Sequence, residues 1–441
     1  MKRHIILIII VTIGLPFFSV AQEHLFSLED CINYALENST DINRAQNNSE
    51  IQSVYLNQSK AARLPNLKLN ASQQFSSTNN YDPSNDQWNR DGNSTFLASL
   101  SSQVYLYNGA KLKNTIKQNE IKFNAAQMDI QTEQEYLSLV VLSAYIDVLL
   151  SKDNVRNSKL QLEATQKQLA YAQARKDAGA ISLSDLLNIK SELATNKTSL
   201  IEAESNRRIM FVALMQLMNM PVRSDFDIQH PPLNQLLAEN IETNPVTVYE
   251  VALNIQPSIK NAELKIESSE KGIKIAKADL LPSLDLNGAI NTVYGSSING
   301  VNFGEQISNG VNPYAGLSLS VPIFKNKETK TQIILAQIQV RNSELELMEM
   351  KNNLRKYIEQ ACTDAQTAQS NYNALQEQLK AENESYQVNN EMFTQGMINS
   401  VDLLSSKNNF IVAENKFTQA KYNLLLQNKV VEYYQGNSIS F

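Results

Sequence analysis

The chain has 441 residues and a formal net charge of −6 at pH 7. This acidic balance argues against nucleic acid as a partner, because nucleic-acid binding relies on clustered Lys and Arg. Only 13 Gly and 11 Pro are present, so the chain has few turns for its length and its elements must be long. Cys31 and Cys362 lie far apart on helical patterns, and we expect two small buried residues rather than a disulfide.

Residues 1–21 have the three parts of a secretory signal peptide. These are the basic pair Lys2 and Arg3, an apolar stretch over 5–20 and a small-residue cleavage site at 19–21. A membrane anchor is the alternative, but the apolar stretch is short and contains a Gly and a Pro, which favours removal. No later stretch approaches the roughly 18 apolar residues of a transmembrane helix. The exported chain is therefore expected to be periplasmic, secreted or membrane-spanning through strands.

Residues 22–221 form a first repeat that begins with a helix and two strands. Apolar residues at helical spacing predict one helix over 26–63, which ends at a Leu-Pro pair. Alternating apolar and polar residues then predict strands over about 66–77 and 96–107. Between them, the polar segment 76–94 contains Asn-Asn, Asp-Pro and Asp-Gly pairs, which predict a loop.

The rest of the first repeat is a very long helical hairpin. From 110 to 177 nothing breaks the helix, which corresponds to about 100 Å. Its far half and the returning helix carry apolar residues seven apart, the spacing of a coiled-coil seam. Between the two helices lies a tip turn over 178–187. There Gly179 ends one helix, and Ser184 or Asp185 is expected to cap the next.

After a linker over 222–245 the same pattern starts again. The second repeat, 246–436, is expected to contain strands at about 283–294 and 314–324 and a tip turn at 395–404, before a tail at 437–441. The junction Leu64-Pro65 matches Leu281-Pro282, and Gly179 matches Gly396, each 217 positions later (281 − 64 and 396 − 179). This constant offset identifies an internal duplication.

The predicted strands have the length of tilted transmembrane β-strands. Four strands cannot close a barrel, and an open sheet edge is not tolerated in lipid. Membrane-spanning strands would therefore require several chains to share one barrel, and three chains would give twelve strands. A soluble sheet is the alternative, but small and mostly uncharged polar faces suit a water-filled lumen. Neighbouring helical hairpins are compatible with either a hollow cylinder or a solid rod.

At this point the chain resembles the TolC family of outer-membrane efflux and export channels. The duplication, the Leu-Pro-x-Leu-x-Leu junctions beginning at Leu64 and Leu281, and the paired turns in which Gly precedes Asp-Leu-Leu by six residues carry the resemblance. It implies a mixed α and β fold with four transmembrane β-strands and very long antiparallel coiled-coil helices in each chain. A homotrimer would form a 12-stranded outer-membrane β-barrel continuous with a 12-helix periplasmic α-barrel, and the linker would belong to a belt around its middle.

The resemblance also implies a function. The chain is expected to be a passive exit duct of a tripartite efflux or type I secretion system, located in the outer membrane with its helical part in the periplasm. Its partners would be outer-membrane lipid, a periplasmic adaptor and, through the adaptor, an inner-membrane pump; no cofactor or metal is implied. The alternative function is a non-conducting periplasmic coiled-coil scaffold or adaptor protein. Drugs, metal ions, siderophores and polypeptides all remain possible cargo.

Several tip residues can be matched to positions with known roles in that family. Gly179 and Gly396 correspond to glycines that make the turns and contact the adaptor, and Ile181 and Ile398 lie in the same turns. Asp185 and Asp402 correspond to acidic residues near the constricted entrance, where rings of negative charge favour cations. For Asp185, helix capping is an equally weighted alternative.

The second turn departs from the family pattern. In the best-studied relatives, a Tyr and an Arg on either side of the second Gly belong to a closing network, whereas this chain has Phe393 and Ile398 there. A further acidic position is occupied by Ser405. Closure is therefore expected to rest on an apolar gate formed by Phe393 with Ile181 and Ile398.

Catalytic motifs find little support in the sequence. It contains no Gly-rich phosphate loop, Cys/His metal spacing or Ser/His/Asp set, and His24 and His230 fall in flanks expected to be flexible. A cluster at one helix end suggests copper export but is more typical of core packing: Met210, Met215, Met218 and Met220. We therefore expect no enzymatic activity.

Overall fold

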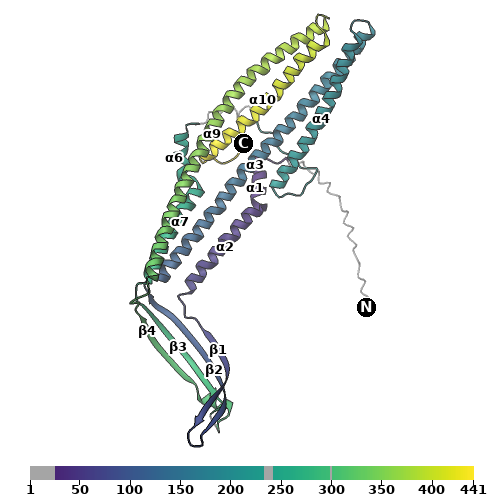
Figure 1. The fold of residues 1–441 in the computed structure, drawn as a ribbon. Coiled ribbons are helices and arrows are strands. Elements are labelled where there is room, and N and C mark those ends of the chain that lie inside the picture. Colours follow the sequence, from purple (N-terminus) through teal and green to yellow (C-terminus); the bar gives the residue numbers. More distant parts are fainter. Residues whose placement is uncertain (1–24, 233–241, 298–299) are drawn as a thin grey trace, which may run out of the picture.

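The structure is a computed structural model that describes residues 25–232, 242–297 and 300–441. The predicted signal peptide lies outside the described residues. The molecule is elongated, with one β-sheet at one end and long helices over the remaining length (Figure 1). The helices end in two separate tips at the end opposite the sheet (Figure 1).

Eight of the helices form two equivalent sets. The first set is α1 (Leu28–Asn38), α2 (Thr40–Ala61), α3 (Lys111–Asp177) and α4 (Leu183–Leu217). The second set is α6 (Pro245–Ile255), α7 (Pro257–Ala278), α9 (Glu328–Thr394) and α10 (Ser400–Tyr434). Corresponding helices have the same lengths, 11, 22, 67 and 35 residues, and their starts differ by 217 throughout (245 − 28, 257 − 40, 328 − 111, 400 − 183). The predicted duplication is confirmed.

Each repeat begins with two helices, so the prediction of one continuous helix over 26–63 is wrong. Ser39 has an extended backbone, and its hydroxyl accepts a hydrogen bond from the N–H of Ile42, so it caps α2 directly after α1 ends. In the second repeat Pro257 enforces the same break, because a proline disfavours helical backbone at the residue before it. The apolar spacing continues across the break, which is why the pattern resembles one helix.

The sheet has four antiparallel strands in the order β1-β2-β3-β4. They are β1 (Lys68–Asp82), β2 (Gln87–Asn108), β3 (Ser283–Gly295) and β4 (Asn312–Ser320). The predicted loop over 76–94 is wrong, because β1 and β2 stay paired as far as Asp82 opposite Gln87 and only 83–86 form the turn. Polar residues suffice there because the ladder satisfies the backbone, and largely exposed faces need no apolar side chains.

The two repeats differ at the far end of the sheet. β2 pairs with β3 only as far as Thr95, so the remainder of the β1–β2 hairpin continues alone beyond the sheet (Figure 1). In the second repeat the connection contains a short helix, α8 (Phe303–Asn309). The ring of Phe303 packs against Phe96 and Tyr294, with ring centroids 5.6 and 5.0 Å apart. The duplicated halves thus share their helices but not their distal connections.

Four helices lie side by side near each end of the shaft. Nearest the sheet the order is α2, α3, α7, α9, and nearest the tips it is α4, α3, α10, α9 (Figure 1). Within the second hairpin the predicted seam is lined by ring contacts: Tyr372 with Phe417 at 5.3 Å and Tyr386 with Phe410 at 5.7 Å. Each chain therefore has one helical edge at α2 and α4 and the other at α9.

The largest core lies where α1, the linker and the ends of α4 and α10 pack around the middle of α3. Three of the clustered methionines are buried in it, Met215, Met218 and Met220, as the packing interpretation predicted. Cys31 belongs to the same core, whereas Cys362 is buried in a second one; both are unpaired, as predicted.

One 18-residue stretch of α3 contradicts the expectation that nothing after the signal peptide resembles a transmembrane helix. It reaches a mean hydropathy of 1.2, so by length and composition it is apolar enough to cross a membrane. The statement that no later stretch approaches such a helix is therefore wrong. Within the chain 39% of that stretch is buried, and the buried apolar residues of α3 include the core residues Val141, Leu142 and Leu149.

Candidate functional site

The two tip turns have the same backbone. In the first, Gly179 has a positive φ of 75°, its N–H donates to the carbonyl of Lys176, and the N–H of Ala180 donates to the carbonyl of Arg175. In the second, Gly396 has a φ of 79°, and equivalent bonds run from Gly396 to Phe393 and from Met397 to Met392. This pair of hydrogen bonds is the Schellman motif, which needs a left-handed residue and so favours Gly. The glycines therefore end α3 and α9 for a local backbone reason.

The helices restart with different caps. Ser182 caps α4: its hydroxyl accepts from the N–H of Asp185, and the Asp185 carboxylate accepts from the N–H of Ser182, which completes a capping box. The expectation that Ser184 or Asp185 is the cap residue is therefore wrong, although Asp185 takes part. In the second turn Asn399 accepts from the N–H groups of Val401 and Asp402. The capping there leaves the Asp402 carboxylate unused.

Asp185 also joins the two turns. Its second carboxylate oxygen accepts from the N–H of Ser400 at 3.1 Å, and Asn188 donates to the hydroxyl of Ser400 at 3.1 Å. Hydrogen bonds from Ser182 and Ser400 lower the pKa of Asp185 to about 2, because they favour its charged form. Asp185 is thus both a helix-capping residue and a link between hairpins.

Arg175 makes a second link that the sequence reasoning missed. Its guanidinium donates to the carbonyl of Phe393 at 2.7 Å and lies over the rings of Tyr171 and Phe393, at 5.8 and 5.6 Å from their centroids. A basic residue in the last turn of a helix is well placed to bind carbonyls. Its position four residues before Gly179 was therefore an available signal.

These links bring most of the predicted tip residues together. Phe393 is 3% exposed and forms a buried cluster with Ala172, Leu186, Ile189 and Leu403, against which Ile181 and Ile398 pack. Beside it is a mostly polar cleft of about 460 Å³, lined by both turns: Arg175, Ala180, Ile181, Ser182, Asp185, Phe393, Gly396, Met397, Ile398, Asn399 and Asp402. Gly179 is in the first turn but does not line the cleft.

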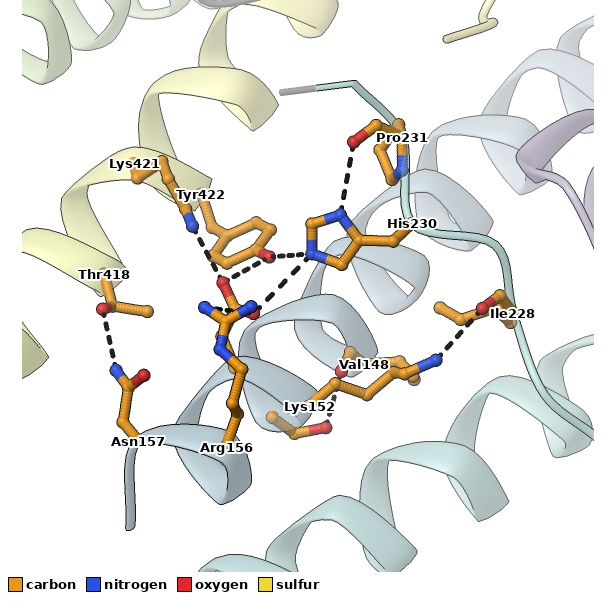
Figure 2. Close-up of polar contacts among 12 residues, drawn as sticks. Val148, Lys152, Arg156, Asn157, Ile228, His230, Pro231, Thr418, Lys421 and Tyr422 are labelled. Carbon is orange, nitrogen blue, oxygen red and sulfur yellow. Dashed lines mark hydrogen bonds and ion pairs between the residues drawn. The ribbon is translucent and has the colours of Figure 1, made fainter. Parts of the chain in front are cut away.

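A separate charged cluster lies far from the tips, between α3 and α10 (Figure 2). The Asp153 carboxylate, 3% exposed, accepts from Lys421 at 2.8 Å and from the Tyr422 hydroxyl at 2.9 Å. Arg156 and the linker residue His230 also approach it, at 3.1 and 3.6 Å. Burial opposes ionisation of Asp153, but Lys421, Tyr422 and Arg156 together outweigh burial, and the pKa of Asp153 is lowered. The expectation that His230 lies in a flexible flank is wrong, because its Nε2 forms a hydrogen bond of 3.2 Å with the Tyr422 hydroxyl.

The cluster around Asp153 is an ion-pair network that fastens the linker and α10 to α3. Among the described residues, no group of three or more His, Cys, Asp and Glu side chains is arranged to hold a metal ion. The tip, where two turns and their cleft lie at one extreme of the molecule, is the better candidate site.

Comparison with known proteins gives the family. The family described as "Outer membrane efflux protein" matches residues 31–220 and 248–432, one segment in each repeat. The chain is 24% identical over 380 residues to the outer membrane protein TolC of Escherichia coli (strain K12), covering 84% of this chain and 74% of that protein. It is 21% identical over 435 residues to the alkaline protease secretion protein AprF of Pseudomonas aeruginosa, covering 95% and 87%.

A solved structure has the same fold. The open state of the Neisseria gonorrhoeae MtrE outer membrane channel aligns with a TM-score of 0.76 and 19% identity, covering 94% of this chain and 90% of that one. The long hairpins and the terminal sheet therefore have the fold of that channel. The chain belongs to the outer membrane efflux protein family of TolC-like channels, and it is an outer-membrane exit duct for efflux or type I secretion, with its helical part in the periplasm, rather than an enzyme.

Proposed function

We propose that three copies of this chain close into one passive channel, which carries substrates from an inner-membrane pump and its periplasmic adaptor to the exterior. The observation that carries this proposal is an open edge on both sides of the chain. Among the strands that the structure describes, β1 and β4 each have a neighbour on one side only. Because an open strand edge is not tolerated in hydrocarbon, β1 of one copy would pair with β4 of the next. A head-to-tail contact of this kind forms a ring when the rotation between copies closes, and for three copies that rotation is a third of a turn.

The helical edges agree with the same ring. On α2, Ile51, Val54 and Tyr55 are 51%, 59% and 52% exposed. On α9, at the opposite edge, Leu345 and Met348 are 61% and 60% exposed. A rotation that joins β1 to β4 also brings α2 of one copy to α9 of the next, so both apolar edges would be covered. Three copies would give twelve strands, an even number within the known range of outer-membrane barrels.

The tips are the proposed docking surface for the adaptor. Gly179 and Gly396 hold the turns in a shape that other residues adopt only with strain, and Ile181 and Ile398 stand beside them. Both turns lie at the extreme end of the shaft, opposite the sheet (Figure 1). An adaptor that continues the channel towards the inner membrane would meet this end first.

The tip is also the proposed entrance filter and gate. Asp402 lines the cleft with a carboxylate that capping leaves unused, so it is the stronger candidate for a ring of negative charge that favours cations. Asp185 would add charge, although hydrogen bonds occupy its carboxylate. Phe393, packed with Ile181 and Ile398, would provide the apolar closure.

In this proposal the pump and the adaptor, rather than the duct, select the transported substrate. Two relatives are named for alkaline protease secretion and for pyoverdine export, so one fold serves a polypeptide and a small molecule. We therefore expect this duct to impose charge and size limits without choosing one substrate.

Purification from outer membranes tests the proposal. We expect a trimer that resists detergent until heated and that gives discrete, cation-preferring conductance in planar bilayers. Leu345→Glu, at the exposed α9 edge, should weaken the trimer because it places a charge in the contact between copies. A wild-type protein that stays monomeric and forms no channels contradicts the duct and favours the non-conducting scaffold.

A further inference from the structure

Besides its buried apolar clusters, the contact between the two hairpins of one chain has a polar part, whereas aromatic ring contacts lie within the second hairpin. Along the first hairpin, α3 presents three polar side chains, spaced four residues apart, to α10. Their hydrogen bonds are Asn157 with Thr418 at 3.4 Å, Gln161 with Glu414 at 3.0 Å, and Thr165 with Lys407 at 2.5 Å. Asp153 and Lys421 end this seam on the side away from the tips, because Asp153 precedes Asn157 in α3, which runs towards the first tip turn. We call this row the hairpin seam.

One member of the seam is a buried charge. Lys407 has a side chain only 4% exposed, and its ammonium lies 3.7 Å from the carboxylate of Glu192, whose side chain is 11% exposed. Lys407 comes from α10 and Glu192 from α4, so the pair crosses from one hairpin to the other. Burial lowers the pKa of Lys407, and the charge of Glu192 opposes that effect. A Lys is almost never this buried unless it is paired.

The surroundings of this pair satisfy its hydrogen bonds. Asn196 donates to Thr165 at 2.8 Å and to Glu192 at 3.3 Å. The Thr165 hydroxyl accepts from Asn196 and Lys407 and donates to the carbonyl of Gln161 at 2.9 Å. A hydroxyl has one donor and two acceptor positions, so all three are used. Removing either charge would leave the other one buried without its partner.

We propose that Lys407 and Glu192 are a positioning pair that holds the second hairpin against the first and thereby sets the resting aperture of the tip. The proposal rests on the exit-duct function. Lys407 lies about 10 Å along α10 from the first residue of that helix. Asp402 lies on the same helix, five residues before Lys407, so the position of Lys407 fixes that of Asp402, and the ring contacts join α9 to α10. The tip links at Asp185 and Arg175 hold the turns, and this pair holds the shaft behind them.

The test is the conductance of single trimers in planar bilayers. In Lys407→Met the buried Glu192 loses its partner, and we expect resting conductance to rise several-fold. The exchange variant Lys407→Glu with Glu192→Lys should return it towards wild type, because the opposite charges are restored. Lys407→Arg, which keeps the charge, should stay closer to wild type than Lys407→Met.

The matched control is Gln161→Ala, which removes an uncharged member of the same seam and should change conductance little. Trimer melting is recorded in parallel, because a purely structural role would lower it without a rise in conductance. If Lys407→Met does not assemble, Glu192→Gln removes the opposite charge and gives the same comparison.

Unchanged conductance in an assembled Lys407→Met or Glu192→Gln trimer overturns the proposal, and so does an exchange variant as leaky as the single one. A wild-type chain that forms no channels refutes the exit duct itself, which is a different outcome.

Discussion

The first and second tip turns share a backbone conformation but differ in the hydrogen bonds that their side chains make. Both have the same Schellman hydrogen bonds around a left-handed Gly. Asp185 of the first turn reaches the main chain of Ser400, and Arg175 reaches the carbonyl of Phe393. The equivalent positions in the second hairpin are Asp402 and Met392 (185 + 217 and 175 + 217), and Met has no charged donor with which to make such a bond.

This difference shows that the two copies of a duplicated backbone make different contacts and can therefore have different roles. At the tips, the first hairpin supplies the charged side chains Asp185 and Arg175, and the second supplies the backbone groups of Ser400 and Phe393 to which they bind. Local geometry accounts for what is equal, because any helix that ends in this motif needs the same Gly. Contacts across the hairpins account for what is unequal. The following variants test whether that division is correct.

Phe393→Ala should have the largest effect. Removal of a buried Phe costs about 3–5 kcal/mol in a well-packed core, and here the cavity would open between the two turns. We expect a marked rise in resting conductance and in the entry of large antibiotics into cells. The matched control is Lys176→Ala, the exposed equivalent position in the first hairpin (393 − 217 = 176). Equal, unchanged leakage in both variants would remove Phe393 from the gate.

Arg175→Met should have the next largest effect. It keeps an unbranched apolar side chain over Tyr171 but loses the charged hydrogen bond to Phe393. Such bonds contribute about 1.5–3 kcal/mol, and less where water reaches the group. Resting conductance should rise by less than in Phe393→Ala. Met392→Ala, at the equivalent position in the second hairpin, is the control, and a larger effect there would reverse the proposed division of roles.

Asp185→Asn should raise resting conductance modestly, since a capping contact contributes about 1 kcal/mol, and Asp402→Asn should instead lower cation preference.

The pH dependence of resting conductance gives a second test of Asp185. Because the pKa of Asp185 is lowered to about 2, its stabilising contribution is fully present above its unfolded pKa, about 3.9, and is lost as pH falls towards 2. Wild-type conductance should therefore stay constant from pH 7 to about pH 4 and rise below it. In Asp185→Asn the acid-induced rise should be absent.

The glycine variants should have the smallest effects and should differ from one another. Gly179→Ala and Gly396→Ala each place a side chain in left-handed backbone, which costs about 1 kcal/mol. A Cβ at Gly396 would also stand 3.4 Å from the Arg175 guanidinium, whereas one at Gly179 meets no atom within 4 Å. Both should weaken adaptor binding, measured by co-purification, and only Gly396→Ala should also raise conductance. Identical conductance in the two would argue against the Arg175 link.

Two segments and one cap of this chain differ from what their local sequence predicts, because local signals compete there with contacts formed on folding. The Asn- and Ser-rich segment 76–94 has loop composition, yet strand pairing provides hydrogen bonds for its backbone and extends the hairpin to residue 82. The helix over 26–63 has one apolar period, but the Ser39 cap divides it. Ser182, rather than Ser184 or Asp185, caps α4, because it directly precedes the first helical residue, which is the position of an N-cap.

The sequence by itself determined the duplication, the great length of the hairpin helices, the positions of the tip turns and the unpaired state of Cys31 and Cys362. These follow from periodicity, glycine and composition, which act over a few neighbouring residues. Only the tertiary structure decided which side chains cross between the hairpins. Lys407 meets Thr165 across 242 positions, and Arg175 meets Phe393 across 218. No local pattern encodes such pairs, because they depend on how two separately formed hairpins come to lie against each other.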